Sequence, residues 1–144
     1  MTLTEKESLL LLGFDFGTKR IGVAIGQKLT KVARPLLTLP AKEGIPHWEK
    51  LTQLIKHWQP QAFVVGIPLN MDGTEQPLTH AARNFAKMLH ERYHLPVYEV
   101  DERLTTVDAR ERLFEAGGYK ALQDGQVDSK AAQLILQNWL DMLS

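Results

Sequence analysis

Apolar residues in the first third of the chain follow the pattern of β-strands. Residues 9–16 are apolar or small except for Asp15, as in a central strand that is covered on both faces. In residues 21–26 large apolar side chains alternate with Gly or Ala, so a second strand has one bulky and one small face. Residues 31–39 suit a third strand, and Pro35 indicates an edge position. Short turns join these strands, which predicts an antiparallel meander.

Helical spacing of the apolar residues then alternates with strand-like runs. The elements expected after the meander are a helix at 48–58, a strand at 62–67, a helix along the stripe 81–93, a strand at 96–100, a helix from a capping box at Thr105 to Gly117, and a final helix opened by Asp128. The predicted fold class is α/β. We expect a mixed five-stranded sheet, in which three antiparallel strands precede β-α units, with helices on both faces.

Length and composition limit the classes of protein to consider. The 144 residues suit a single domain, 1–144, and 44% hydrophobic with 24% charged residues is an ordinary globular balance. No apolar run approaches the ~20 residues of a spanning helix, and the apolar stretch after Glu7 is too short for a signal peptide. We therefore expect a cytoplasmic protein without a membrane partner. The absence of cysteine excludes disulfides, thiolate metal sites and a cysteine nucleophile.

Charge is balanced over the chain but not along it. Seventeen basic and seventeen acidic side chains cancel. Between Phe16 and Arg34, however, there are no acids and five cations, namely Lys19, Arg20, Lys28, Lys31 and Arg34. Such a basic stretch could follow the phosphates of a nucleic acid. A solvated hairpin face whose charge is balanced elsewhere is the alternative.

Asp15 is the first candidate for chemistry, because it stands at the end of the most buried strand. Burying a lone carboxylate costs on the order of several kcal/mol. Asp15 therefore needs a partner, a metal ion or a solvent-filled cleft. Lys19 or Arg20 could be a purely structural ion-pair partner.

Further acids follow other predicted elements. Asp101 and Glu102 leave the last strand, and Asp128 opens the final helix. We expect the carboxyl ends of the first and last strands to lie side by side, where open α/β sheets build their sites. Acids that meet there would repel one another unless divalent cations bridged them, and oxygen ligands suit Mg²⁺ or Mn²⁺. Two such ions about 3.5 to 4 Å apart can drive phosphodiester hydrolysis.

Each of these acids also has a structural alternative. Asp128 is a suitable helix N-cap, and Asp101 or Glu102 can pair with Arg103. Strand alternation aims Asp101 and Glu102 at opposite faces. We take Asp15, Asp101 and Asp128 as metal ligands and leave open whether Glu102 replaces Asp101.

Two motifs suggest other classes of enzyme. The sequence of residues 15–18, DFGT, is similar to the phosphate-binding turn of sugar kinase, actin and Hsp70 ATPases, but the chain is too short for their two domains. His90 and His94 satisfy the H-E-x-x-H pattern of zinc proteases, although Leu95-Pro96 ends the helix at once. A third ligand would have to come from Glu111 or Glu115, on a helix that the sequence does not place.

Four motifs in order, "GFDFGTKRIGVAIG", "VVGIPLNMDGTE", "VDERLTT" and "VDSKAAQLIL", resemble the YqgF family, also called RuvX. The resemblance covers nearly the whole chain and implies a ribonuclease H-like fold and a metal-dependent nuclease. The family was first proposed to resolve Holliday junctions and later assigned to 5′-end processing of pre-16S rRNA in ribosome biogenesis. A nucleic-acid-binding module that has lost catalysis is a third alternative.

The resemblance also implies roles for individual residues. Asp15 matches the family's first acid, the Asp101-Glu102 pair matches the second acidic position, and Asp128 matches the C-terminal acid. The strand that ends in "VVGIPLN" lacks the glutamate that related nucleases carry, so an acid from the next strand must replace it.

We expect four cations to contact nucleic acid: Lys19, Arg20, Arg103 and, on a mobile flap, Lys120. The resemblance favours RNA as the partner, with branched DNA and ribosomal precursor particles as further partners. The sequence leaves monomer and homodimer open.

Overall fold

The computed structural model describes residues 9–104 and 126–143, so the helix expected from Thr105, the loop after it and Lys120 lie outside this part. The strands are β1 (Leu10–Asp15), β2 (Arg20–Gln27), β3 (Val32–Lys42), β4 (Ile45–Pro46), β5 (Ala62–Ile67) and β6 (Val97–Asp101). The helices are α1 (Trp48–Trp58), α2 (Pro77–Tyr93), α4 (Gln126–Asp141) and a single 3-10 turn, η1 (Glu102–Leu104).

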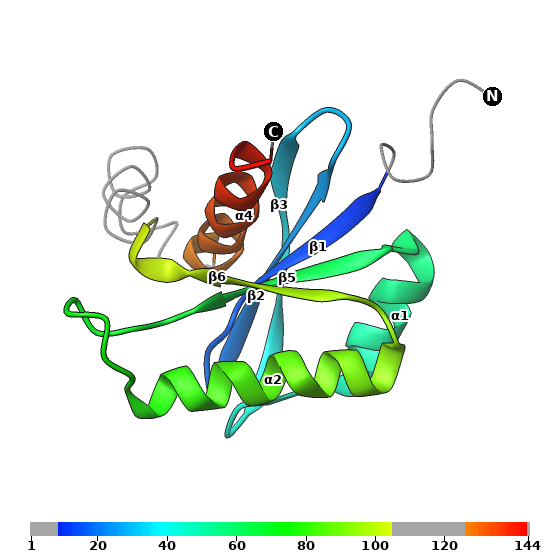
Figure 1. Ribbon diagram of the computed structural model, residues 1–144. Helices are drawn as coiled ribbons and strands as arrows, with labels where there is room; N and C mark the ends of the chain where they lie inside the picture. Colours follow the sequence, from blue (N-terminus) through cyan, green and yellow to red (C-terminus); the bar gives the residue numbers. More distant parts are fainter. Residues whose placement is uncertain (1–8, 105–125, 144) are drawn as a thin grey trace.

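One mixed sheet organises the structure, with the strand order β4-β3-β2-β1-β5-β6 (Figure 1). β2 runs antiparallel to β1 and β3 antiparallel to β2, whereas β5 and β6 continue the sheet in parallel. The predicted meander followed by β-α units is therefore confirmed. The predicted strand number was too low, because the two residues of β4 pair with the end of β3.

The expected contact between the first and last strands was wrong. β5 lies between β1 and β6 and pairs with both of them. The crossover through α2 returns the chain to the outer side of β5, and β6 becomes the edge. An acid at the end of β6, Asp101 or Glu102, must therefore reach across β5 to approach Asp15.

Helices cover both faces of the sheet, as predicted (Figure 1). On one face Phe14, Phe63 and Phe85 bring β1, β5 and α2 together, with ring centroids 5.7 Å apart for Phe14 and Phe63 and 5.4 Å for Phe14 and Phe85. The opposite face packs against α4. Within residues 9–104 and 126–143, no helix is long and apolar enough to cross a membrane.

The α4 face is the small face that the sequence predicted. Gly22, Ala24 and Gly26 of β2 point toward α4, while the bulky residues of β2 join the other core. A Cβ added to Gly13 of β1 would lie only 2.7 Å from Cβ of Leu136. The helix axis can thus approach the sheet more closely than side chains on these strands would allow.

Two glutamines of α4 also bind the backbone at the start of β3 and at Lys31, the residue before it. Gln133 Nε2 donates to the carbonyl of Ala33 at 2.9 Å, and the Ala33 N–H donates to Gln137 Oε1 at 2.9 Å. Gln137 Nε2 further donates to the carbonyl of Lys31 at 2.7 Å. These bonds satisfy backbone groups that an open strand edge would leave to water or to another chain.

We predict that Gln137→Ala lowers the free energy of unfolding by about 1–3 kcal/mol, because it leaves the part-buried N–H of Ala33 and the carbonyl of Lys31 without their amide partner. Urea unfolding followed by circular dichroism measures this loss. Gln53→Ala, on the exposed face of α1, is the control and should change stability by less than about 0.5 kcal/mol. Equal stability of the two variants would contradict the role given to Gln137.

Candidate active site

Asp15, the last residue of β1, lies between two glycines on the neighbouring strands. It pairs in register with Gly22 of β2 and with Gly66 of β5. Residues in register point to the same face of a sheet, so the half-buried Asp15 side chain shares the α4 face with these glycines. The central carboxylate is therefore flanked on both sides by strand positions without a side chain.

Glu102 fills the space over Gly66. A Cβ added to Gly66 would lie 2.8 Å from Glu102 Oε1 and 2.9 Å from Glu102 Cγ. The Oε1 atom is buried. The carboxylate of Glu102 therefore reaches from η1 across β5 to the position beside Asp15. Of the two acids that the sequence predicts as a replacement for the acid missing at the end of β5, Glu102 is the one that reaches this position.

Asp128 comes to the other flank, over Gly22. A Cβ added to Gly22 would lie 1.9 Å from the carbonyl oxygen of Asp128 and 2.9 Å from the nitrogen of Ser129. Asp128 is in the first turn of α4, which begins two residues earlier, so it is not the N-cap considered as the alternative. Its Oδ2 lies 3.1 Å from Nε of Arg20, the first residue of β2.

Asp101 has a different environment from Glu102. Its carboxylate accepts from Arg103 Nη2 at 2.6 Å, from Arg103 Nε at 3.0 Å and from the Arg103 backbone N–H at 2.9 Å. Its neighbour Val100 belongs to the core beneath α4, so strand alternation directs Asp101 to the other face. These hydrogen bonds from Arg103 lower the pKa of Asp101 below its usual value.

Arg103 connects Asp101 with the loop between β5 and α2. Besides Asp101, its Nη1 lies 3.4 Å from the carbonyl of Met71 in the loop between β5 and α2. The carboxylate in turn raises the pKa of the Arg103 guanidinium. Arg103 therefore joins the end of β6 to this loop, and the expected contact with nucleic acid would compete with these bonds.

The five cations of the basic stretch do not form one patch. Lys19 and Arg20 are exposed at the Asp15 end of β2. Lys28 and Lys31 lie in the turn at the opposite end, where the N–H of Lys31 donates to the carbonyl of Gln27. An eight-residue strand separates the two ends, a distance of about 23 Å at the usual rise per residue.

Asp15, Glu102 and Asp128 approach the end of β1 and are all carboxylates. Their oxygen atoms are the ligand type that a hard divalent cation prefers. In their present arrangement, no three acidic or histidine side chains within the described parts of the chain lie close enough together to hold a metal ion. The Arg20 guanidinium already contacts one oxygen of the Asp128 carboxylate. The metal ligands named from the sequence therefore stay predictions.

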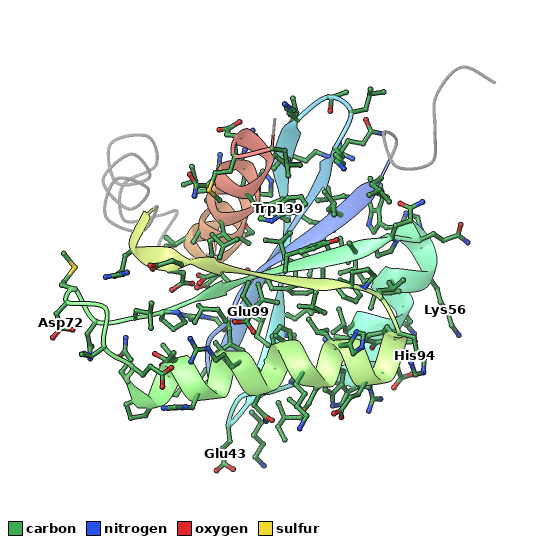
Figure 2. The ribbon with its side chains drawn as sticks, in the orientation of Figure 1. Glu43, Lys56, Asp72, His94, Glu99 and Trp139 are labelled. Atoms are coloured by element: carbon green, nitrogen blue, oxygen red, sulfur yellow. The ribbon has the colours of Figure 1, made fainter. Side chains whose placement is uncertain are left out.

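The H-E-x-x-H motif lies away from these acids. α2 ends at Tyr93, and His94 adopts a left-handed conformation with φ 55°, so the two histidines of H-E-x-x-H do not share a helical face. Figure 2 shows His94 at this helix end and Asp72 at the tip of the loop between β5 and α2. Asp72 accepts from the Thr74 hydroxyl at 2.6 Å, which lowers its pKa and closes a local turn.

Sequence reasoning missed Gly22 and Gly66 as parts of the site. The sequence does place each glycine next to an end of its predicted strand. The structure adds that both glycines pair in register with Asp15. The role became clear only with the partners that occupy the space above them.

Comparison with known proteins gives relatives along the whole chain. The family model described as "RuvX: Holliday junction resolvase" matches residues 9–142. A protein of Shewanella oneidensis is 56% identical over 131 residues, which cover 91% of this chain and 93% of that protein. One of Pectobacterium carotovorum is 56% identical over 135 residues, covering 94% and 97%. Both carry the name "Putative pre-16S rRNA nuclease".

Solved structures show the same architecture at low identity. The Holliday junction resolvase of fowlpox virus is 12% identical, with a TM-score of 0.56 over 94% of this chain and 100% of that one. RuvC of Thermus thermophilus in complex with a Holliday junction is 15% identical, with a TM-score of 0.51 over 92% and 93%. This likeness concerns the fold, and it confirms the predicted ribonuclease H-like class.

We predict a pH-dependent stability difference between the wild type and Asp101→Asn. The folded-state pKa of Asp101 lies below its usual 3.8, so its contribution is complete above the unfolded-state value and disappears as pH falls through the folded-state value. Urea unfolding at several pH values between about 3 and 7 should show a constant deficit of the variant above about pH 5 that shrinks below about pH 4. A deficit that does not change with pH would contradict the ionised hydrogen bond to Arg103.

Proposed function

This chain belongs to the RuvX family, and from this membership we propose that it cleaves the precursor of 16S rRNA at its 5′ end. The family and the nuclease names of the relatives confirm the prediction of an enzyme that hydrolyses phosphodiester bonds. The processing of pre-16S rRNA is the finer assignment, which the names of relatives at 56% identity support.

The observation that carries the proposal is the arrangement around Asp15. Acids from three separate elements, β1, η1 and the first turn of α4, approach one edge of the sheet because Gly22 and Gly66 leave space for them. Asp128 is already compensated by Arg20 at 3.1 Å, and the described acids do not enclose a metal ion in this arrangement. Their approach to one glycine-lined end of the sheet supports a functional site, because a structural role does not require acids from three elements at the same place.

We assign Asp15, Glu102 and Asp128 as the residues that would hold a divalent ion, Mg²⁺ or Mn²⁺. Such an ion, or a pair of them, would activate water and stabilise the leaving oxygen of a phosphodiester. Asp101 is a positioning residue in this proposal. By accepting the Arg103 N–H it closes the turn η1, which directs Glu102 over Gly66.

Cationic side chains near the acids would position the substrate. Lys19 and Arg20 are exposed beside Asp15 at the start of β2 and can contact phosphates of the nucleic acid. The turn that carries them is braced, because Ala41 N donates to the Lys19 carbonyl and Gly44 N donates to the Thr18 carbonyl, both at 2.9 Å. Lys120, outside the described residues, stays a predicted contact.

A second candidate function is the cleavage of branched DNA. It is favoured by the description of the family as Holliday junction resolvases. Resolution of a junction needs two symmetric incisions and hence a homodimer, whereas cleavage of a single RNA strand does not. We place the reaction in the cytoplasm, on ribosomal precursor particles, where precursor rRNA is found.

We predict that Glu102→Gln and Asp15→Asn each reduce cleavage at least about 100-fold, because each removes a ligand charge from the proposed site. Asp101→Asn keeps its shape and should lose less than about tenfold, because that side chain faces Arg103. The measurement is cleavage of a labelled RNA spanning the 5′ end of 16S rRNA, with and without Mn²⁺, alongside a four-way DNA junction of equal length.

The three variants separate the alternatives. Loss in Asp101→Asn with full activity in Glu102→Gln would reverse the assignment of the pair. Binding of the RNA without cleavage by the wild type, under every metal condition, would indicate the non-catalytic module. Cleavage of the junction alone would establish the second candidate.

We predict that Gly66→Ala abolishes most of the cleavage while the protein stays folded. The new Cβ would stand 2.8 Å from Glu102 Oε1 and 2.5 Å from Ile135 Cδ1, so the carboxylate must move. Gly26→Ala is the matched control, because its Cβ would meet Leu136 Cδ2 at 2.9 Å, on the same face but away from the acids. We expect each variant to lose about 1–3 kcal/mol of stability from overpacking, and only Gly66→Ala to lose activity. Equal activity of both variants would argue against Glu102.

A further inference from the structure

Arg20 lies where a substrate-binding cation and a proposed metal ligand meet. Its Nε is 3.1 Å from Oδ2 of Asp128. Both residues are held at this place by backbone contacts, since Arg20 begins β2 and the backbone of Asp128 rests on Gly22, two residues further along the same strand. Arg20 shares the face of Gly22 by strand alternation, and this is the face of Asp15.

The contact gives Asp128 a cation before any metal ion is bound. A guanidinium and a divalent ion at the same carboxylate repel each other, so Arg20 opposes the binding of the ion.

Arg20 can leave Asp128 at little cost. Its side chain is 63% exposed, against 23% for Asp128, and ion pairs with such exposure are weak. The planar guanidinium also binds the oxygens of a phosphate in a forked geometry. A phosphodiester of the substrate is thus a competing partner for Arg20 that the free protein lacks.

We propose that Arg20 exchanges partners when nucleic acid binds: it moves from Asp128 to a substrate phosphate and thereby frees Asp128 for the divalent ion. This inference rests on the proposed function and adds an order of binding to it, in which nucleic acid binds before Asp128 binds the divalent ion. The metal site becomes complete only with substrate in place, so that hydrolysis is coupled to binding. Since coupling between two ligands is reciprocal, the ion must also strengthen the binding of nucleic acid.

The test measures binding of Mn²⁺ rather than activity. Free Mn²⁺ is titrated by electron paramagnetic resonance against the wild type, Arg20→Gln and Arg34→Gln, with and without the 16S 5′-end RNA, at low temperature and with RNA integrity checked on a gel. Arg34→Gln removes the same charge from an exposed arginine that lies over Trp58, 5.6 Å from the ring centroid, and pairs in register with Ile25 near the far end of β2.

Without RNA, we expect Arg20→Gln to bind Mn²⁺ about two- to fivefold more tightly than the wild type, which corresponds to the strength of an exposed ion pair. Arg34→Gln should match the wild type. RNA should tighten Mn²⁺ binding by a larger factor in the wild type than in Arg20→Gln, because only the wild type has a competing guanidinium to remove. Circular dichroism verifies that each variant is folded, and Arg20→Ala, which also removes the charge, replaces Arg20→Gln if that variant does not fold.

The outcomes distinguish this inference from the proposed function. Equal Mn²⁺ affinities of Arg20→Gln, Arg34→Gln and the wild type, or the same RNA effect in all three, would overturn the exchange and leave the metal site intact. Absence of Mn²⁺ binding by the wild type, with and without RNA, would overturn the metal site itself and the exchange with it.

Discussion

The close contact of α4 with the glycine-containing face of the sheet is the constraint on which the rest of the structure depends. The carbonyl oxygen of Asp128 occupies space that any side chain at position 22 would need, and Leu136 does the same above Gly13. Interiors are packed densely enough that such contacts leave no room for adjustment. α4 can therefore take this position only because Gly13 and Gly22 have no side chains. In this position the first turn of α4 brings Asp128 to the end of β1.

The end of β6 supplies two acids with different surroundings. Asp101 and Glu102 are separated by a single peptide bond, but Asp101 accepts three kinds of donor atom from Arg103. Glu102 instead crosses β5 to the gap at Gly66. The acid that is saturated by its neighbour closes the turn, and the turn directs the other acid to the centre of the sheet.

Charge balance at this edge is local and adjustable. A buried carboxylate is expensive unless it is paired, and an exposed ion pair is inexpensive to break. The pair of Arg20 and Asp128 combines the two conditions, because the arginine is exposed and the acid is largely covered. A site of this kind can keep its acids compensated in the free protein and still accept another cation when a phosphate attracts the arginine.

Among the described elements, the sequence by itself determined every strand except β4, the helices α1, α2 and α4, and the small face of β2. It also named the candidate acids, since periodicity and strand ends are local properties of the chain. The helix at residues 48–58 has the predicted bounds, and the small face of β2 is the one that α4 covers. Only the tertiary structure decided which acids meet. Strand order depends on the crossover of the chain, and that crossover put β5 between β1 and β6. The missing side chain at Gly66 matters only because Glu102 occupies the space above it. No local pattern encodes such a contact between residues 36 positions apart.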